Sequence, residues 1–274
     1  MCILKISRIW NKILYDVSFL LKKEPILSDF YQSSILQHQS FTSSLSYILS
    51  NKLSTSMISE KKIQGIFDDV YLNDRSILNF IVQDIKAVLK RDPAVNDYLT
   101  PLLYLKGFHA LEAYRISHYL WNTGKKSLSL YLQSRISSEF SVDIHPAAFI
   151  GSGVMLDHAT GIVIGEGVTI ENDVSILHSV TLGGTGKNFS QNRHPTIRKG
   201  VVIGAGAKIL GNIEVGSGAK IGAGSIVLKN VPSDVTVVGV PAKIVSQVSS
   251  KKYYSQKKKN SLKYINIFQH GDGI

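Results

Sequence analysis

Two breaks in an otherwise regular repeat carry the residues of this sequence that could do chemistry. The first break holds Asp157 and His158, and the second holds Arg193 and His194. A neutral imidazole can accept a proton from a hydroxyl group near pH 7. A guanidinium can bind a carboxylate through two parallel hydrogen bonds. These residue types therefore predict a site for a small substrate that carries both a hydroxyl and a carboxylate.

A histidine that acts as a base is helped by a carboxylate at its second ring nitrogen, because the carboxylate fixes the tautomer and stabilises the imidazolium. Asp157 is adjacent to His158 and is expected to point elsewhere. Asp143 lies fifteen positions before His158, roughly one coil of three six-residue units, so we expect it to stack close to the imidazole. The blander hypothesis, that Asp157 and His158 only cap an irregular turn, stays open.

The chain offers no cysteine near these breaks that could carry an acyl group. Cys2 is the only cysteine, so an internal disulfide is also excluded. If an acyl group moves, direct attack by the acceptor is the simpler route. The backbone N–H groups of Gly183 and Gly184 could then stabilise a tetrahedral oxyanion.

The element that must position these residues is a repeat of six residues. Aliphatic side chains recur at this spacing, with glycine often following, at Ile144, Ile150, Leu156, Ile164, Ile170, Ile176, Leu182, Ile197, Ile203, Ile209, Val215, Ile221 and Val227. Such a period predicts a parallel β-helix, in which each unit forms one short strand with its aliphatic side chain inward. The breaks measure eight residues, from Leu156 to Ile164, and fifteen residues, from Leu182 to Ile197. A regular solenoid needs neither, and loops on a rigid scaffold are where function is usually found.

Residues 1–140 lack the frequent glycines of the repeat, and their apolar pattern predicts an α-helical domain. Apolar residues recur at helical spacing near the start, which favours an amphipathic helix over a targeting segment. A second set of apolar residues at helical spacing predicts a helix over 77–89. Pro93 should end this helix or open the next one, with Asp92 as the N-cap of the next helix. A further helix is expected over 101–123, where His109 and His118 are interpreted as packing or capping residues.

Charge and hydropathy limit the class of protein. The net charge is +11, and residues 249–274 contribute six basic residues against one acidic residue. A basic chain can bind nucleic acid, but the sequence has no nucleic-acid motif, and a solvated tail explains the excess. No apolar run approaches the roughly 20 residues of a membrane span. We therefore expect a cytoplasmic protein that binds neither nucleic acid nor membrane.

Several longer stretches extend this pattern: RDPAVNDYLTPLLYLKGFHALEAYRISHYLW, VDIHPAAFIGSGVMLDHATGIVIGE, IENDVSILHSVTLGGTGK, RHPTIRKGVVIGAGAKILGNIEVGSGAKIGAGS and GVPAKIV. They resemble the serine acetyltransferase family of hexapeptide-repeat acyltransferases. The resemblance implies an α-helical domain over 1–140, a left-handed parallel β-helix over 141–248 and a flexible basic C-terminal tail over 249–274. It implies transfer of acetyl from acetyl-CoA to the L-serine hydroxyl, which gives O-acetylserine for cysteine biosynthesis, with no permanently bound cofactor and no metal.

The resemblance also implies roles for single residues. His158 would be the general base, and Asp143 would be its orienting partner. Four further residues would hold the serine substrate: Asp92 and Asp157 at its amino group, Arg193 at its carboxylate, and His194. Coenzyme A would lie along an outer groove of the β-helix, with contacts at Gly184, Ala205, Lys220 and Ala223.

The family further implies an assembly and a partner. Its members form trimers with active sites between subunits, and two trimers commonly join through the helical domains into a hexamer. L-cysteine would inhibit by occupying the serine site. Ile274, with its free carboxylate, would dock into O-acetylserine sulfhydrylase. Two departures stand out, the NFSQN loop before Arg193 and the lysine-rich tail, and they bear on loop closure and partner affinity.

Three other classes of function stay open on the residues alone. A zinc hydro-lyase on this scaffold could use His158, His178 and His194, although the close histidine pair of a structured zinc site is missing and His178 is expected to face outward. An acyltransferase could use a different acceptor, such as a sugar. A non-catalytic trimer could present its tail to a partner. Metal content, acceptor range and turnover would separate these alternatives.

Overall fold

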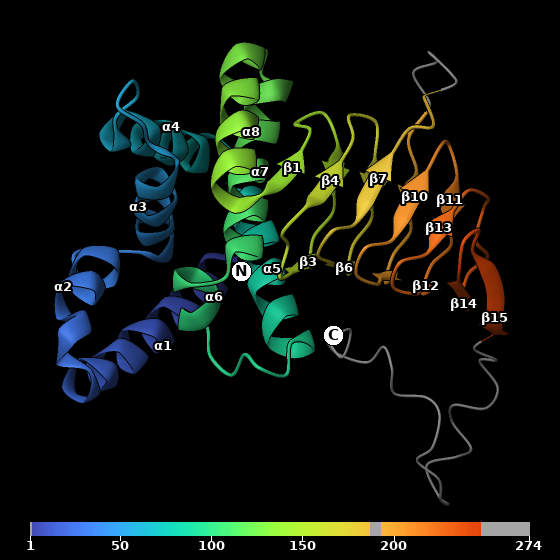
Figure 1. The fold of residues 1–274 in the computed structure, drawn as a ribbon. Coiled ribbons are helices and arrows are strands. Elements are labelled where there is room, and N and C mark those ends of the chain that lie inside the picture. The colour runs from blue at the N-terminus through green and yellow to red at the C-terminus, as the bar shows by residue number, and fades with distance from the viewer. Residues whose placement is uncertain (1, 187–192, 248–274) are drawn as a thin grey trace, which may run out of the picture.

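The computed structural model describes residues 2–186 and 193–247 (Figure 1). The helices come first in the chain, and the strands follow as a solenoid that extends away from α7 and α8. Residues 187–192 of the second break and the basic tail with Ile274 lie outside the described residues.

The helical part follows one order along the chain. Its elements are α1 (Cys2–Lys23), the 3-10 turn η1 (Pro25–Leu27), α2 (Ser28–Tyr31), the π-helical turn η2 (Gln32–Leu36), α3 (Phe41–Leu53), α4 (Glu60–Asn73), α5 (Ile77–Arg91), α6 (Leu99–Leu103), α7 (Lys106–Asn122) and α8 (Lys126–Phe140). The amphipathic first helix is confirmed, since α1 buries Ile9, Ile13 and Val17 on one face. The helix predicted over 77–89 is confirmed as α5.

Two predictions for this part are wrong. The single helix expected over 101–123 is two helices, because the chain turns at Tyr104 and Leu105 between α6 and α7. The turn brings Gly107 of α7 against the β-helix, where an added Cβ would overlap the carbonyl oxygen of Leu156. Asp92 does not cap a following helix: it is the C-cap residue of α5, and its Oδ1 accepts a hydrogen bond from the N–H of Ala94 at 2.9 Å.

Three sheets close the β-helix, and the chain visits them in the order A, B, C on each coil. Sheet A holds β1 (Val142–Ile144), β4 (Ile162–Ile164), β7 (Thr181–Gly183), β10 (Lys208–Leu210) and β13 (Ile226–Val227). Sheet B holds β2 (Phe149–Ile150), β5 (Thr169–Ile170), β8 (Thr196–Ile197) and β11 (Glu214–Val215). Sheet C holds β3 (Met155–Asp157), β6 (Ser175–Leu177), β9 (Val202–Ile203), β12 (Lys220–Ile221), β14 (Val235–Val238) and β15 (Lys243–Gln247). Pairing is parallel except between β14 and β15, and the predicted left-handed winding is confirmed.

The repeat itself is confirmed by burial. Every aliphatic position of the predicted series is 6% exposed or less, from Ile144 to Val227. These side chains fill the interior of the solenoid, because successive strands stack in register. A regular coil is 18 residues long, as the pairing of Val202 with Lys220 shows.

The breaks lengthen single coils without disturbing this register. Val142 pairs with Ile162, 20 residues later, so the first break adds two residues to a coil of 18. The second break falls between the paired residues Thr181 and Lys208, which are 27 residues apart, so it adds nine. Asp143 pairs with Val163, so it does not stack in register on His158; the expected closeness of its side chain to the imidazole stays a prediction.

A buried ion pair joins the helical part to the first coil. The Arg115 guanidinium on α7 donates to Asp84 Oδ2 on α5, at 2.9 Å from Nε and 2.5 Å from Nη2. It also donates to the carbonyl oxygens of Ile150 and Gly151 at 3.1 and 2.8 Å. Asp84 Oδ1 accepts a hydrogen bond from the N–H of Val154 at 2.9 Å, so both partners hold the turn that leads into β3.

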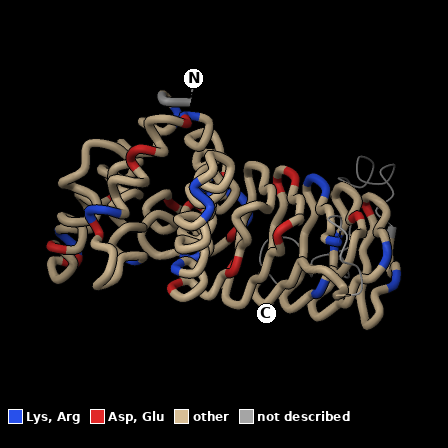
Figure 2. Tube along the Cα trace, turned by 90° about the horizontal axis from the view of Figure 1, so that it is seen from above, with Lys and Arg blue, Asp and Glu red and all other residues tan. Residues whose placement is uncertain are grey.

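Charged residues of both signs occur in the helical part and in the β-helix of the described chain. Seen from above, basic and acidic positions are mixed along both the helices and the β-helix (Figure 2). No described helix combines the length and the apolar character that crossing a membrane requires.

Candidate active site

Two of the three edges of the β-helix carry the predicted site residues. We call the turns from sheet C to sheet A the C–A edge; they comprise residues 158–161, 178–180, 204–207 and 222–225. The turns from sheet A to sheet B form the A–B edge; in the described residues they comprise 145–148, 165–168, 184–186 with 193–195, and 211–213.

The first break inserts two left-handed residues at the C–A edge. His158 has φ 53° and Ala159 has φ 59°, and after Thr160 comes the left-handed corner residue Gly161. Residues other than glycine rarely adopt a positive φ. The backbone strain that a positive φ causes is concentrated at functional sites. Ala159 is fully buried, and its N–H donates to the carbonyl of Asp157 at 2.5 Å. The His158 side chain, by contrast, is 58% exposed. The extra residues therefore present one imidazole to the outside of a packed corner.

Two groups lie beside this imidazole. His158 Nε2 is 3.9 Å from Asp157 Oδ1, so the adjacent carboxylate does not point elsewhere as expected. The ring of His178 stands edge-on to that of His158, with centroids 5.9 Å apart. Within the described residues, His178 Nδ1 is buried and has no hydrogen-bond partner.

Sequence reasoning considered His178 only as a zinc ligand and missed it as a neighbour of His158. Asp157 pairs with Leu177 in the ladder, so the next residue of each strand, His158 and His178, shares the same corner. A spacing of one 20-residue coil between two histidines was the signal that could have found it. No group of metal-ligating side chains that could hold an ion occurs in the described part of the chain.

The charge of Asp92, at the end of α5, also acts at this edge. Burial of the Asp157 carboxyl raises its pKa, and the neighbouring charge of Asp92 raises it further, whereas His158 opposes the shift. Two carboxylates near one another are best stabilised by a cation between them. Asp157 therefore lies beside His158 and within reach of the charge of Asp92, while the roles assigned to the three residues stay predictions.

Asp143 has a different environment. It lies on β1 in sheet A, and its Oδ1 accepts a hydrogen bond from Gln133 Nε2 of α8 at 2.7 Å. Among the described residues no hydrogen bond joins Asp143 to His158. Its assignment as the orienting partner of the base stays a prediction.

The A–B edge holds the second cluster. His194 Nδ1 accepts a hydrogen bond from the N–H of Gly167 at 3.2 Å, which leaves Nε2 as the protonated ring nitrogen. Burial lowers the pKa of His194, with Arg193 adding to the effect and Glu166 opposing it. The Arg193 side chain packs along Gly184, where a Cβ would meet its methylene carbons at 3.4 Å.

In the described part of the chain, the two clusters share no charged neighbour. The charges that shift the pKa of Asp157 belong to His158, Asp92 and His178. Those that shift the pKa of His194 belong to Arg193, Glu166 and His145. Sheet A, whose longest strands have three residues, separates the two edges by about 10 Å. This separation is longer than a substrate of four or five heavy atoms in length.

The predicted coenzyme A contacts divide between the same edges. Ala205 and Ala223 lie above His178 on the C–A edge, and Gly206 donates from its N–H to the carbonyl of His178 at 2.9 Å. Lys220 lies on β12, two residues before that edge. Gly184 lies on the A–B edge beside Arg193.

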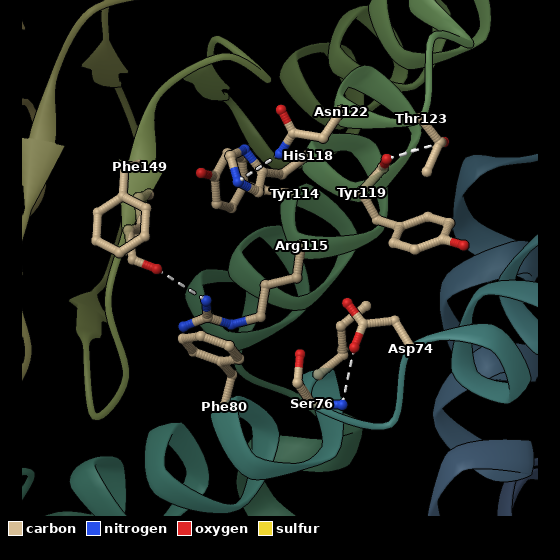
Figure 3. Close-up of a pocket in the computed structure, with 12 residues that line it drawn as sticks. Asp74, Ser76, Phe80, Tyr114, Arg115, His118, Tyr119, Asn122, Thr123 and Phe149 are labelled. Atoms are coloured by element: carbon tan, nitrogen blue, oxygen red, sulfur yellow. Dashed lines mark hydrogen bonds between the residues drawn. The ribbon is translucent and has the colours of Figure 1, made fainter.

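A separate cavity of about 340 Å³ lies between α5, α7 and β2, and none of the predicted residues lines it (Figure 3). The Arg115 guanidinium reaches its wall and lies 4.5 Å from the centre of the Phe80 ring. Because Asp84 and two backbone carbonyls already engage this guanidinium, it offers no free charge to a ligand. The cavity belongs to the junction between the two parts and not to the site.

Comparison with known proteins decides between the remaining classes of function. Two family descriptions match the chain: "Serine acetyltransferase, N-terminal" over residues 9–113 and "Bacterial transferase hexapeptide (six repeats)" over residues 194–229. The serine acetyltransferase of Buchnera aphidicola subsp. Schizaphis graminum (strain Sg) is 69% identical over 261 residues, which cover 94% of this chain and 100% of the relative. This chain belongs to the serine acetyltransferase family. As a serine acetyltransferase it is an acyltransferase, and the family resemblance is confirmed.

Other serine acetyltransferases agree over most of the chain. That of Escherichia coli (strain K12) is 54% identical over 266 residues, which cover 97% of each chain. A solved serine acetyltransferase in complex with CoA superposes with a TM-score of 0.84 at 55% identity, covering 88% of this chain and 100% of that one. A solved complex with cysteine gives a TM-score of 0.85 at 57% identity, covering 88% and 93%.

Proposed function

We propose that this serine acetyltransferase transfers acetyl from acetyl-CoA directly to the hydroxyl of L-serine, with His158 as the general base. The observation that carries the proposal is the inserted turn at the C–A edge. It holds an exposed imidazole 3.9 Å from the Asp157 carboxylate, on which the charge of Asp92 also acts, on a scaffold that otherwise needs no histidine there. An imidazole can accept a hydroxyl proton at neutral pH.

The proposed reaction needs no covalent intermediate on the enzyme. A ring nitrogen of His158 accepts the hydroxyl proton while the serine oxygen attacks the carbonyl carbon of the thioester. The tetrahedral intermediate collapses, the C–S bond breaks, and the coenzyme A thiolate takes a proton from the imidazolium. The only cysteine of the chain, Cys2, lies at the start of α1 and far in sequence from this edge.

Two aspartates compete for the role of orienting the base. Asp157 is nearest to His158 in the described geometry, and Asp143 is the residue that the family resemblance assigns. An orienting residue acts mainly on kcat, whereas a residue that binds the amino group of serine acts mainly on KM. Asp143→Asn should therefore lower kcat, and Asp157→Asn should raise the serine KM.

The separation of the two clusters supports a site shared between subunits. In the proposed arrangement, Asp92, Asp157 and His158 of one subunit meet the Arg193 and His194 of the next. The ammonium of serine would lie between the carboxylates, and its own carboxylate would bind Arg193 in a bidentate way. Acetyl-CoA would lie in the groove between these subunits, against Ala205, Ala223 and Lys220 of the first and Gly184 of the second.

Two regulatory proposals follow from the same site. L-cysteine would compete with L-serine, since a thiol replaces the hydroxyl while the ammonium and the carboxylate stay the same; a relative has been solved with cysteine bound. The tail would dock into O-acetylserine sulfhydrylase through Ile274, which lies outside the described residues. Deletion of Ile274 should abolish binding of the sulfhydrylase and leave acetyl transfer intact.

A dimer of trimers is proposed through the helical part. Tyr15 and Phe19 on α1 and Ile26 on η1 are 75%, 66% and 92% exposed, and exposed apolar groups of this size favour an interface. The contact would cover this apolar surface and leave the two edges of each β-helix free for trimer formation.

The decisive experiment is release of coenzyme A thiol from acetyl-CoA with and without L-serine. Release should depend on L-serine and should be absent with L-threonine or sugars. His158→Ala should reduce kcat by about 10²-fold or more, whereas His118→Ala, which removes an imidazole bonded to Pro146 away from the site, should not. Near-normal turnover of the His158→Ala variant would remove His158 from its assigned role.

A further inference from the structure

We infer that Arg91 is a positioning residue that sets the place of Asp92 in the substrate site. The inference rests on the proposed role of Asp92 in binding the amino group of serine. Arg91 is the last residue of α5, and Asp92 follows it directly. The two side chains have different partners. Arg91 binds the β-helix, whereas the charge of Asp92 acts on the Asp157 carboxylate.

The Arg91 guanidinium is engaged on two successive coils of the β-helix. Its Nη1 donates to the carbonyl oxygens of Gly153 and Val174 at 2.9 and 3.3 Å and lies 3.2 Å from Ser175 Oγ. Its Nη2 lies 3.4 Å from Asp173 Oδ1. The side chain is only 19% exposed. Such a planar group can hold several acceptors in fixed directions at once, which a lysine ammonium cannot do with the same geometry.

Asp92 itself is rigidly tied to Arg91. Its N–H closes the last turn of α5 on the carbonyl of Val88 at 2.9 Å, and its Oδ1 accepts from the N–H of Ala94 at 2.9 Å. Val88 and Val95, on either side of Asp92 in sequence, pack with Met155 of β3 in one small apolar cluster. Any shift of the end of α5 would therefore carry the Asp92 carboxylate with it.

The distance between Asp92 and Asp157 thus depends on the contacts that Arg91 makes with the β-helix. Asp157 is fixed at the end of β3, and Asp92 arrives from another part of the chain. The binding of an ammonium group is strongest when both carboxylates face it. A displacement of about 1 Å in a site is enough to lose much of that binding free energy. Asp84 and Arg115 hold the helices on the first coil farther from the site, and Arg91 is the polar contact next to Asp92 that fixes the end of α5.

The experiment compares Arg91→Gln and Arg91→Lys with Lys90→Gln in the full-length enzyme. Lys90 is the adjacent exposed residue, so Lys90→Gln removes the same charge from the same turn without touching the β-helix. Arg91→Gln should raise the serine KM by about tenfold or more, which is the effect of losing one charge-assisted contact, with the acetyl-CoA KM nearly unchanged. Arg91→Lys should recover part of the loss, and Lys90→Gln should behave as wild type.

A double variant separates this inference from the proposed function. If Arg91 acts through Asp92, adding Arg91→Gln to Asp92→Asn should raise the serine KM little beyond Asp92→Asn alone. Independent, multiplying effects would overturn the inference, and so would an equal rise in both KM values, which indicates a merely structural role. If Asp92→Asn itself leaves the serine KM unchanged, the assigned role of Asp92 fails, and the inference fails with it. If Asp92→Asn raises KM and Arg91→Gln does not, only the inference fails.

Discussion

The imidazole of His194 occupies the space that a side chain at Gly165 would need. A Cβ at Gly165 would lie 2.5 Å from His194 Nε2 and 2.6 Å from Cδ2, so only glycine lets the ring rest there. The N–H of Gly167 then fixes the ring from its other side through Nδ1. Two glycines of the first regular coil thus seat a histidine that the sequence places about 30 residues later.

We predict that Gly165→Ala displaces this imidazole and weakens binding of L-serine. The serine KM should rise by about tenfold, the cost of one lost charge-assisted hydrogen bond, and kcat should fall less. Steady-state kinetics with varied serine would measure both. Gly65→Ala on α4, where nothing lies within 4 Å of the added Cβ, is the control and should be silent. An unchanged KM for Gly165→Ala would separate His194 from substrate binding.

Two inactive variants should restore each other when their subunits mix. His158→Ala disables the C–A edge, and Arg193→Ala disables the A–B edge. If each site combines one edge from each of two subunits, random mixing at equal amounts should leave about a quarter of the sites intact. Activity would be measured after joint unfolding and refolding, and again after simple mixing of folded proteins. Complete inactivity of the refolded mixture would mean that both edges act within one chain.

The buried pair of Arg115 and Asp84 should be a main determinant of stability. Arg115→Met leaves the Asp84 carboxylate buried without its cation, which costs about 3–5 kcal/mol. Urea unfolding at a fixed protein concentration should show a markedly lower midpoint. Arg198→Met removes an arginine that bonds Glu171 and Glu214 on the solvent side of sheet B, and it should change the midpoint little. Equal midpoints for the two variants would contradict this account of the junction.

His109 should make the fold less stable in acid. The side chain is 1% exposed, its Nε2 donates to the carbonyl of Leu102 at 2.8 Å, and burial lowers its pKa to about 4 from an ordinary value of 6.5. Between these values the unfolded chain binds more protons than the folded one, so stability falls as pH drops from about 6.5 to about 4. The loss would approach roughly 3 kcal/mol at the acid end.

The test of this pH effect is the slope of stability against pH. In His109→Gln no proton is taken up at this position on unfolding, so its curve should be flatter than that of the wild type over the same window. Above pH 6.5 the two slopes should agree. His118→Gln, which changes a half-buried histidine on the same helix, is the matched control. Parallel curves for wild type and His109→Gln would show that another group controls acid stability.

Much of the fold could be predicted from local patterns in the sequence. The six-residue aliphatic period determined the solenoid, because each inward side chain packs on those of the next coil. The helical stripes of α1 and α5 were readable for the same reason, since one apolar face per helix is a local property. The boundary between α6 and α7 was not readable, because the turn at Tyr104 and Leu105 depends on how Gly107 packs against Leu156.

The sequence by itself determined where chemistry could occur: the two breaks, their length and the residue types within them. Only the tertiary structure decided which of these residues meet. The 20-residue first coil stacks Asp143 on Val163 and leaves His158 beside His178. The end of α5 brings Asp92 to Asp157 across more than sixty residues of chain. Such neighbours depend on coil length and on packing between distant segments, and a periodic pattern specifies neither.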